Sequence, residues 1–385
     1  MSWPTAPCRL AAACLAAALA FAAPALAACP EGETATADGC ASAEAIRARI
    51  DAIVTAAMAT DHLKAVLVGT DVAGARTLAA WGETMTGVLA TPDMRFRNGA
   101  VAIAYLGTLL LQLADAGTVR LDAPLAEWLP DMPEADRITL EMLMNGTSGY
   151  ADYVTDPAFI AAYDADPFRA WTEDDLLAYA FARPMACAPG TCWSYAHTNF
   201  VVLGRALAVA TGRPLDALLR DGILAPLGLT GTRSALTAEI PPPVLHAFDA
   251  ERGRYEESTY WNPSWTLAHG AIMTTTIADV LTSATAIGAG TLVSPAAHAR
   301  LLAPATARFA PWNQRRWYGL GVFVIDGWIV QNPSFSGYAA TMAYLPARDL
   351  ALAVSVTFAP GATAQNPSTD IVKAIAAYLA PEAPL

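Results

Sequence analysis

Tyr195 and His197 are the side chains in this 385-residue chain whose types and spacing best suit proton transfer. A histidine can change its charge near neutral pH and act as a general base, and a tyrosine hydroxyl can both donate and accept a hydrogen bond. Both residues also have a structural interpretation. A buried tyrosine hydroxyl commonly finds a partner, and a lone histidine needs a nucleophile to act on. The sequence therefore leaves catalytic, ligand-binding and structural roles open.

Ser148 is the first serine to consider as a nucleophile. It lies in Gly146-Thr147-Ser148-Gly149, which is superficially similar to the Gly-x-Ser-x-Gly turn that exposes a nucleophilic serine after a strand. The fifth position of that pattern is occupied by Tyr150, and no predicted strand leads into the turn. We therefore predict that Ser148 is not a nucleophile.

Hydrophobic periodicity predicts the elements that position these residues. In the N-terminal part of the chain, apolar residues recur at steps of three and four or in short runs bounded by turn residues. The expected elements are a helix at 42–60 capped by Ser42, a hairpin of 65–68 and 77–81, a short strand at 94–96, and a helix at 100–116 capped by Asn98.

Strand patterns are sparse in residues 118–315, where short helical patterns such as 174–182 and 199–211 alternate with Pro- and Gly-rich segments, and they return near the C-terminus. A sheet built from both ends of a chain, with a mostly helical insertion between them, is a mixed α/β architecture. The expected C-terminal elements are strands at 318–325, 328–330, 339–345 and 350–357 and a helix at 368–380.

Composition excludes several classes of function. The chain is 55% hydrophobic and 15% charged, which is typical of a folded globular protein, and its formal net charge is −12. Lys64 and Lys373 are its only lysines. Because nucleic-acid binding depends on neutralising phosphates with basic side chains, we predict no nucleic-acid partner. We also predict no cofactor and no metal, since His197 is the only histidine near Cys187 and Cys192.

The first 27 residues have the layout of an export signal. Arg9 precedes an apolar stretch, Pro24 interrupts that stretch before it is long enough to span a membrane, and Ala25-Leu26-Ala27 is a small-residue cleavage site. We expect an exported protein, periplasmic or extracellular, with no membrane span. The predicted organisation is a signal peptide at 1–27, an N-terminal extension at 28–41 and a main domain at 42–385.

Four cysteines remain once the signal is removed, an even number that suits an oxidising compartment. Sequence proximity favours two local disulfides, Cys29 with Cys40 and Cys187 with Cys192. An alternative stays open for Cys29, because Leu26-Ala27-Ala28-Cys29 also resembles a bacterial lipobox. Lipidation would then anchor the protein at Cys29 and leave Cys40 unpaired.

Several segments between residues 42 and 380, taken in order, resemble the serine β-lactamase and D,D-peptidase superfamily, most closely its class C-like and esterase-like branch. This resemblance implies an antiparallel sheet flanked by helices, with a large helical subdomain. The sheet half is expected at about 42–99 and 316–385 and the helical half at about 100–315. The segments that carry the resemblance are 94–103, 110–117, 121–124, 138–143, 147–150, 189–195, 198–204, 318–321 and 337–338.

The catalytic Ser-x-x-Lys motif of that superfamily is absent from this sequence. The motif places a nucleophile and an amine one turn apart at the start of a helix. The resemblance puts Ala100 at the serine position and Ile103 at the lysine position. No shift of alignment restores the motif, because Asp61 and Asp370 stand three residues before the two lysines.

Two further motifs of the superfamily are altered. Tyr195-Ala196-His197 keeps the tyrosine of the Tyr-x-Asn motif and replaces its asparagine by histidine. In the strand motif, Gln331 replaces a histidine or lysine, and Pro333 replaces a glycine and removes a backbone donor. The resemblance places the 331–336 segment across the cleft from Tyr195. The ligand-cleft residues that it implies are Gln331, Asn332, Ser334 and Ser336.

The sequence thus predicts an exported superfamily member that lacks the acyl-serine mechanism and acts as a binding or regulatory relative of cell-wall peptidases. Its expected partner is a cell-wall peptide or a small ester or amide. The alternative is an active esterase, carboxypeptidase or β-lactamase that uses Tyr195, His197 and a non-standard nucleophile such as Ser334 or Ser336.

Overall fold

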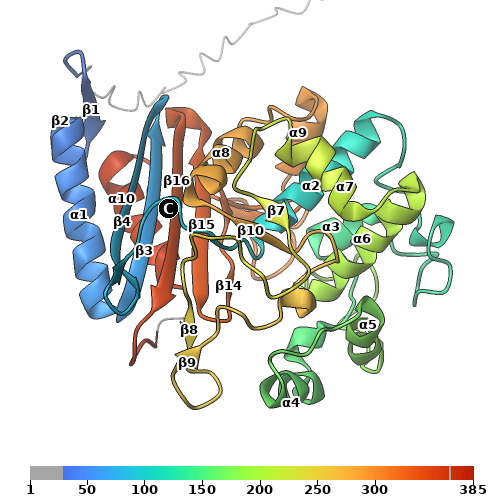
Figure 1. The fold of residues 1–385 in the computed structure, drawn as a ribbon. Helices are drawn as coiled ribbons and strands as arrows, with labels where there is room; N and C mark the ends of the chain where they lie inside the picture. Colours follow the sequence, from blue (N-terminus) through green and yellow to red (C-terminus); the bar gives the residue numbers. More distant parts are fainter. Residues whose placement is uncertain (1–28, 364–365) are drawn as a thin grey trace, which may run out of the picture.

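A large antiparallel sheet forms the centre of the molecule in a computed structural model that describes residues 29–363 and 366–385 (Figure 1). The predicted signal peptide lies outside the described residues. Strands from the two ends of the chain meet where β16 pairs with β3. The strand order is β11 (Arg316–Tyr318), β12 (Phe323–Ile325), β13 (Trp328–Gln331), β15 (Tyr338–Leu345), β16 (Leu350–Phe358), β3 (Leu63–Val72), β4 (Ala75–Met85) and β5 (Val88–Leu89), with β14 (Ser334–Phe335) also paired to β15.

Helices cover both faces of this sheet. The N-terminal helix α1 (Ala43–Thr60) and the C-terminal helix α10 (Pro367–Leu379) pack on one face, and α8 (Ile277–Gly288) packs on the other (Figure 1). Alternate side chains of β3 point to opposite faces, so Val66 joins the core under α1 and α10 while Leu67 joins the core on the α8 side.

The helical half surrounds α2, whose first three turns are buried and which contacts helices on several sides. Its apolar residues are buried all round, as in a central helix. The helices of this half are α2 (Val101–Asp115), α3 (Leu140–Asn145), α4 (Pro157–Ala165), α5 (Glu173–Phe181), α6 (His197–Thr211), α7 (Leu215–Leu219) and α9 (Pro295–Leu301). Smaller pairings join β6 (Phe96–Arg97) and β7 (Arg233–Ser234) to β10 (Met273–Thr275), β1 (Glu33–Thr36) to β2 (Gly39–Ser42), and β8 (Phe248–Asp249) to β9 (Glu256–Glu257).

The predicted fold class is confirmed, and so is the Ser42 cap, whose Oγ accepts a hydrogen bond from the amide of Ala45 at 3.2 Å. The Asn98 cap is wrong. Gly99, at a φ of +55°, turns the chain after Asn98, so α2 starts from Ala100 without a side-chain cap. The Asn98 backbone carbonyl, rather than its side chain, accepts from the amide of Val101 at 3.4 Å.

Two strand predictions also need correction. The segment 318–325 is two strands, β11 and β12, because Gly321, at a φ of +86°, reverses the chain between them. The strand predicted at 94–96 is present as β6 with bounds shifted to Phe96–Arg97, and it pairs with β10 in a small sheet. This small sheet leads directly into the start of α2, where the site begins.

Candidate functional site

A cleft of about 400 Å³ lies between the N-terminus of α2, the loop that enters α6, and the β13–β14 segment of the sheet. Most of the candidate site residues predicted from the sequence line this cleft. Of the described residues that line it, none is Lys, Arg, Asp or Glu. The lining residues are Gly99, Ala100, Val154, Trp193, Tyr195, His197, Trp265, Thr266, Leu267, Phe323, Gln331, Asn332, Pro333, Ser334, Phe335 and Asn366.

Ala100 and Ile103 are one turn apart at the start of α2 but differ in exposure. Ala100 lines the cleft, whereas Ile103 is 0% exposed and belongs to the main hydrophobic core. A Cβ added to Gly99 would lie 2.6 Å from Cβ of Pro333 and 2.7 Å from Cε1 of Phe335. The Pro333 and Phe335 side chains are therefore packed against the residue that precedes Ala100, where they leave no room for a longer side chain at position 99.

Tyr195 lines the cleft. Its hydroxyl has no hydrogen-bond partner among the described residues. Burial raises the pKa of Tyr195 well above its usual value, and Tyr318 and Asp152 add to this shift. The phenol is therefore protonated at neutral pH. In that state it can donate or accept a hydrogen bond, but it is a poor base.

His197 is paired with Asp152, a residue that the sequence analysis did not single out. Nδ1 of His197 lies 3.1 Å from Oδ2 of Asp152, and the backbone amide of His197 donates to Oδ1 of Asp152 at 3.1 Å. Burial alone would raise the pKa of Asp152. The attraction of the imidazole and the hydrogen bonds from His197 and Val154 outweigh it, so the pKa of Asp152 is lowered and the carboxylate is ionised. The two residues are 45 positions apart, and no local pattern links them.

The 331–336 segment divides between the cleft and its surroundings. Gln331 and Asn332 line the cleft. Nε2 of Gln331 donates to the carbonyl of Gly321 at 2.7 Å, so this amide is already hydrogen-bonded within the protein. Ser334 also lines the cleft. Ser336 does not, because its hydroxyl lies 2.9 Å from that of Tyr163 in a neighbouring pocket. Ser336 has a left-handed backbone conformation, with a φ of +47°, and lines that neighbouring pocket.

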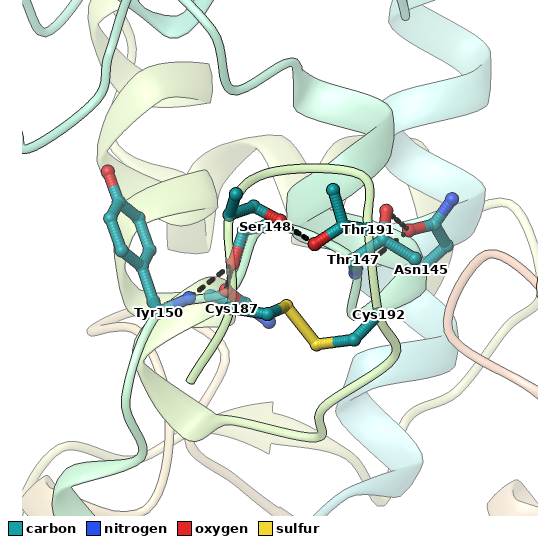
Figure 2. The surroundings of a disulfide bond; sticks show 9 residues. Asn145, Thr147, Ser148, Tyr150, Cys187, Thr191 and Cys192 are labelled. Atoms are coloured by element: carbon teal, nitrogen blue, oxygen red, sulfur yellow. Dashed lines mark hydrogen bonds between the residues drawn. A yellow bond between two sulfur atoms is a disulfide. The ribbon is translucent and has the colours of Figure 1, made fainter. Parts of the chain in front are cut away.

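Ser148 is fully buried, and its Oγ donates to Oδ1 of Asn199 at 2.5 Å. Figure 2 shows it in the 145–150 loop beside the Cys187–Cys192 disulfide. Backbone hydrogen bonds join this loop to the segment before Tyr195: the amides of Ala186, Gly190 and Ser194 each donate to it at 2.8 Å. The buried serine therefore supports the wall of the cleft and does not face a ligand.

Both predicted disulfides, Cys29–Cys40 and Cys187–Cys192, are present. The first closes the β1–β2 hairpin next to α1, far along the chain from the cleft. The second ends at Cys192, directly before Trp193 in the cleft wall. A bonded Cys29 has no free thiol to lipidate, so the structure favours the first of the two alternatives for this residue.

We expect the double variant Cys187→Ser/Cys192→Ser to lose about 2 kcal/mol of unfolding free energy, as for a short closed loop. Its amides at 193–197 should exchange hydrogen faster, because the disulfide holds the segment that carries Trp193 and Tyr195. Hydrogen–deuterium exchange with mass spectrometry measures this. Cys29→Ser/Cys40→Ser is the matched control and should lose about 3 kcal/mol without faster exchange at 193–197. Equal exchange in the two variants would contradict a positioning role for Cys187–Cys192.

Comparison with known proteins identifies the family. A sequence model described as Beta-lactamase matches residues 50–376, which is most of the chain. The chain belongs to the beta-lactamase family. This agrees with the predicted resemblance and with the mixed sheet and flanking helices of the structure.

Two relatives match part of the chain, and one of them is named for a peptide substrate. The chain is 38% identical to penicillin-binding protein 4 of Amycolatopsis lactamdurans over 155 residues, which cover 37% of each protein. It is 29% identical to the D-alanyl-D-alanine-carboxypeptidase/endopeptidase AmpH of Escherichia coli (strain K12) over 166 residues, 41% of this chain and 42% of that protein. The matched segments thus span less than half of these relatives' lengths.

A solved structure extends the similarity over nearly the whole fold. The D-stereospecific amidohydrolase from Streptomyces sp. aligns with a TM-score of 0.75 and 26% identity, covering 85% of this chain and 97% of that chain. Within the described residues of this family member, no helix is long and apolar enough to cross a membrane. The same residues hold no cluster of histidine, cysteine or acidic side chains suited to a metal ion.

Proposed function

We propose that this protein is an exported, ligand-binding member of the beta-lactamase family that does not form an acyl-serine. The observation that carries the proposal is the first turn of α2. Ala100 lines the cleft at the position implied for the nucleophile, and Ile103, at the position implied for the amine, is buried in the core. Neither side chain can attack, donate or accept.

The chemistry of Tyr195 supports the same proposal. An acyl-transfer site needs a base beside its nucleophile, and a phenol whose pKa is raised by burial stays protonated. Export is supported by the layout of residues 1–27 and by the two disulfides, since disulfides persist in oxidising compartments. The names of the carboxypeptidase and amidohydrolase relatives favour a peptide or amide as the ligand.

One observation favours the second candidate, an active hydrolase. Asp152 and His197 form a carboxylate–imidazole pair at the cleft, and such a pair can orient a general base. Ser334 is the serine of the 331–336 segment that shares the cleft with this pair. We rank this candidate second because Ala100 stands at the position implied for the nucleophile and the Ser336 hydroxyl lies beside that of Tyr163.

Purified mature protein separates the two candidates. We expect no covalent labelling by a fluorophosphonate or a β-lactam and no turnover of a chromogenic ester, together with thermal stabilisation by a cell-wall peptide. Ligand at one hundred times its dissociation constant should add about 2.7 kcal/mol to the unfolding free energy. Labelling that maps to Ser334, or ester turnover that Tyr195→Phe abolishes, would contradict the binding proposal and support an active hydrolase.

A further inference from the structure

We infer that the cleft selects an uncharged ligand group that donates a hydrogen bond, and that Asp152 sets this preference by fixing the tautomer of His197. The inference rests on the proposed function in one respect, since it takes the cleft as the ligand site. It goes further by naming the chemistry that the cleft accepts and rejects.

The tautomer follows from what a carboxylate can do. Both oxygens of Asp152 face Nδ1 of His197, at 3.3 and 3.1 Å, and an ionised carboxylate only accepts hydrogen bonds. In the neutral imidazole, the proton therefore sits on Nδ1. Nε2 is left as an acceptor, and a ligand that meets it must supply the hydrogen.

The position of the ring directs Nε2 to the ligand side. His197 lines the cleft, and its Nδ1 edge is occupied by Asp152. The Tyr195 ring stands edge-on to the imidazole, with 5.2 Å between ring centroids. Among the described residues, Nε2 has no hydrogen-bond partner. The free ring nitrogen and the Tyr195 hydroxyl are thus two neighbouring polar groups that a ligand can use.

The cleft offers no lysine or arginine to an anionic group. Its lining carries no Lys, Arg, Asp or Glu side chain, and aromatic rings from Trp193, Trp265 and Phe335 form part of its wall. A carboxylate placed beside a neutral His197 would lose its water without gaining an opposite charge, which is costly. Removing a neutral amide from water costs much less free energy, and the amide can donate a hydrogen bond to Nε2 of His197.

Two neighbouring pockets that share lining residues with the cleft carry charged side chains. Ser334 and Phe335 also line the pocket that holds Asp249 and Glu251, which would repel an anion. Phe323 and Asn332 are shared with the other pocket, which holds Arg316 and Lys373. Both of these cations are exposed, and Lys373 is paired with Asp370 at 3.2 Å, so they attract an anion in the cleft only weakly.

The test compares N-acetyl-D-alanyl-D-alanine with its C-terminal amide by titration calorimetry at pH 8. The two compounds differ only in that one ends in a carboxylate and the other in a neutral group that donates. We expect the amide to bind at least tenfold more tightly. Equal binding, or tighter binding of the acid, would overturn the inference.

Asp152→Asn tests the positioning role. An asparagine can present its amide N–H to Nδ1, which moves the imidazole proton to Nε2 and turns that nitrogen into a donor. The ratio of the amide's affinity to the acid's affinity should then fall to about one or below. Asp131→Asn removes the same charge from an exposed surface residue and should leave the preference unchanged. An unchanged preference in Asp152→Asn would show that the carboxylate does not set it.

Nitrogen-15 NMR of His197 gives a readout that needs no ligand. We expect the Nδ1–H tautomer in the wild type and the Nε2–H tautomer in Asp152→Asn; the Nε2–H form in the wild type would overturn the inference. Hydrolysis of the amide with its selectivity retained would contradict the proposed function alone. Failure of both compounds to bind would count against the cleft as the ligand site, and so against both.

Discussion

Replacing Ile103 with lysine should destabilise the protein by at least about 3 kcal/mol, because a buried ammonium without a partner is costly. Ile103 is 0% exposed within the main core, and its backbone carbonyl lies close to Gly321. Chemical denaturation of the wild type and of Ile103→Lys measures the effect. The expected signature is a lower denaturation midpoint with an unchanged slope.

Two control variants separate the effect of the buried charge on stability from the effect of the changed side-chain shape. Ile103→Met keeps the volume and polarity roughly constant and should cost less than about 1.5 kcal/mol. Ile160→Lys places the same charge on α4, where the native side chain is 44% exposed, and should change stability by no more than about 0.5 kcal/mol. If Ile103→Lys is also nearly neutral, a polar pocket persists under Ala100, and Ala100→Ser/Ile103→Lys becomes a candidate for gained hydrolase activity.

Gly149→Ala should destabilise by about 2–6 kcal/mol. Gly149 has a φ of +83°, a conformation that costs a residue with a side chain about 1–3 kcal/mol. An added Cβ would also lie 2.1 Å from the carbonyl oxygen of Cys187, so the 186–194 segment would have to move. That steric conflict adds about 1–3 kcal/mol. We expect weaker ligand binding as well, since the same segment carries Trp193.

Gly212→Ala is the matched control for this variant. Gly212 caps the end of α6 at a φ of +64°, but nothing lies within 4 Å of the position that its Cβ would take. Its cost should be about 1 kcal/mol and should leave binding unchanged. Similar losses in Gly149→Ala and Gly212→Ala would mean that the Cys187 segment does not press against Gly149 in solution.

Local patterns in the sequence were enough to predict the long strands of the large sheet and several of the helices. Apolar periodicity placed α1, α2 and α10, and apolar runs placed the β3–β4 hairpin and the strands β13, β15 and β16. The errors occurred where glycine conformation mattered. Gly99 displaced the cap of α2, and Gly321 split a predicted strand, because a positive φ reverses the chain without changing its hydrophobic pattern.

The candidate site was harder to predict because its contacts join distant positions. Asp152 meets His197 across 45 positions, and Phe335 packs against Gly99 across the whole helical half. Ser334 and Ser336 look equivalent in the sequence, yet only Ser334 lines the cleft, and the Ser336 hydroxyl lies beside that of Tyr163.

What the sequence alone determined is the absence of a Ser-x-x-Lys pair, and it also favoured the pairing of near cysteines. The first depends only on where two lysines stand in the chain, and the second only on short loops that any compact fold can close. The tertiary structure decided that Ala100, Tyr195 and His197 share one cleft lined by no Lys, Arg, Asp or Glu and that Asp152 contacts the histidine. Such long-range contacts follow from how the sheet and helices pack, and no local pattern encodes them.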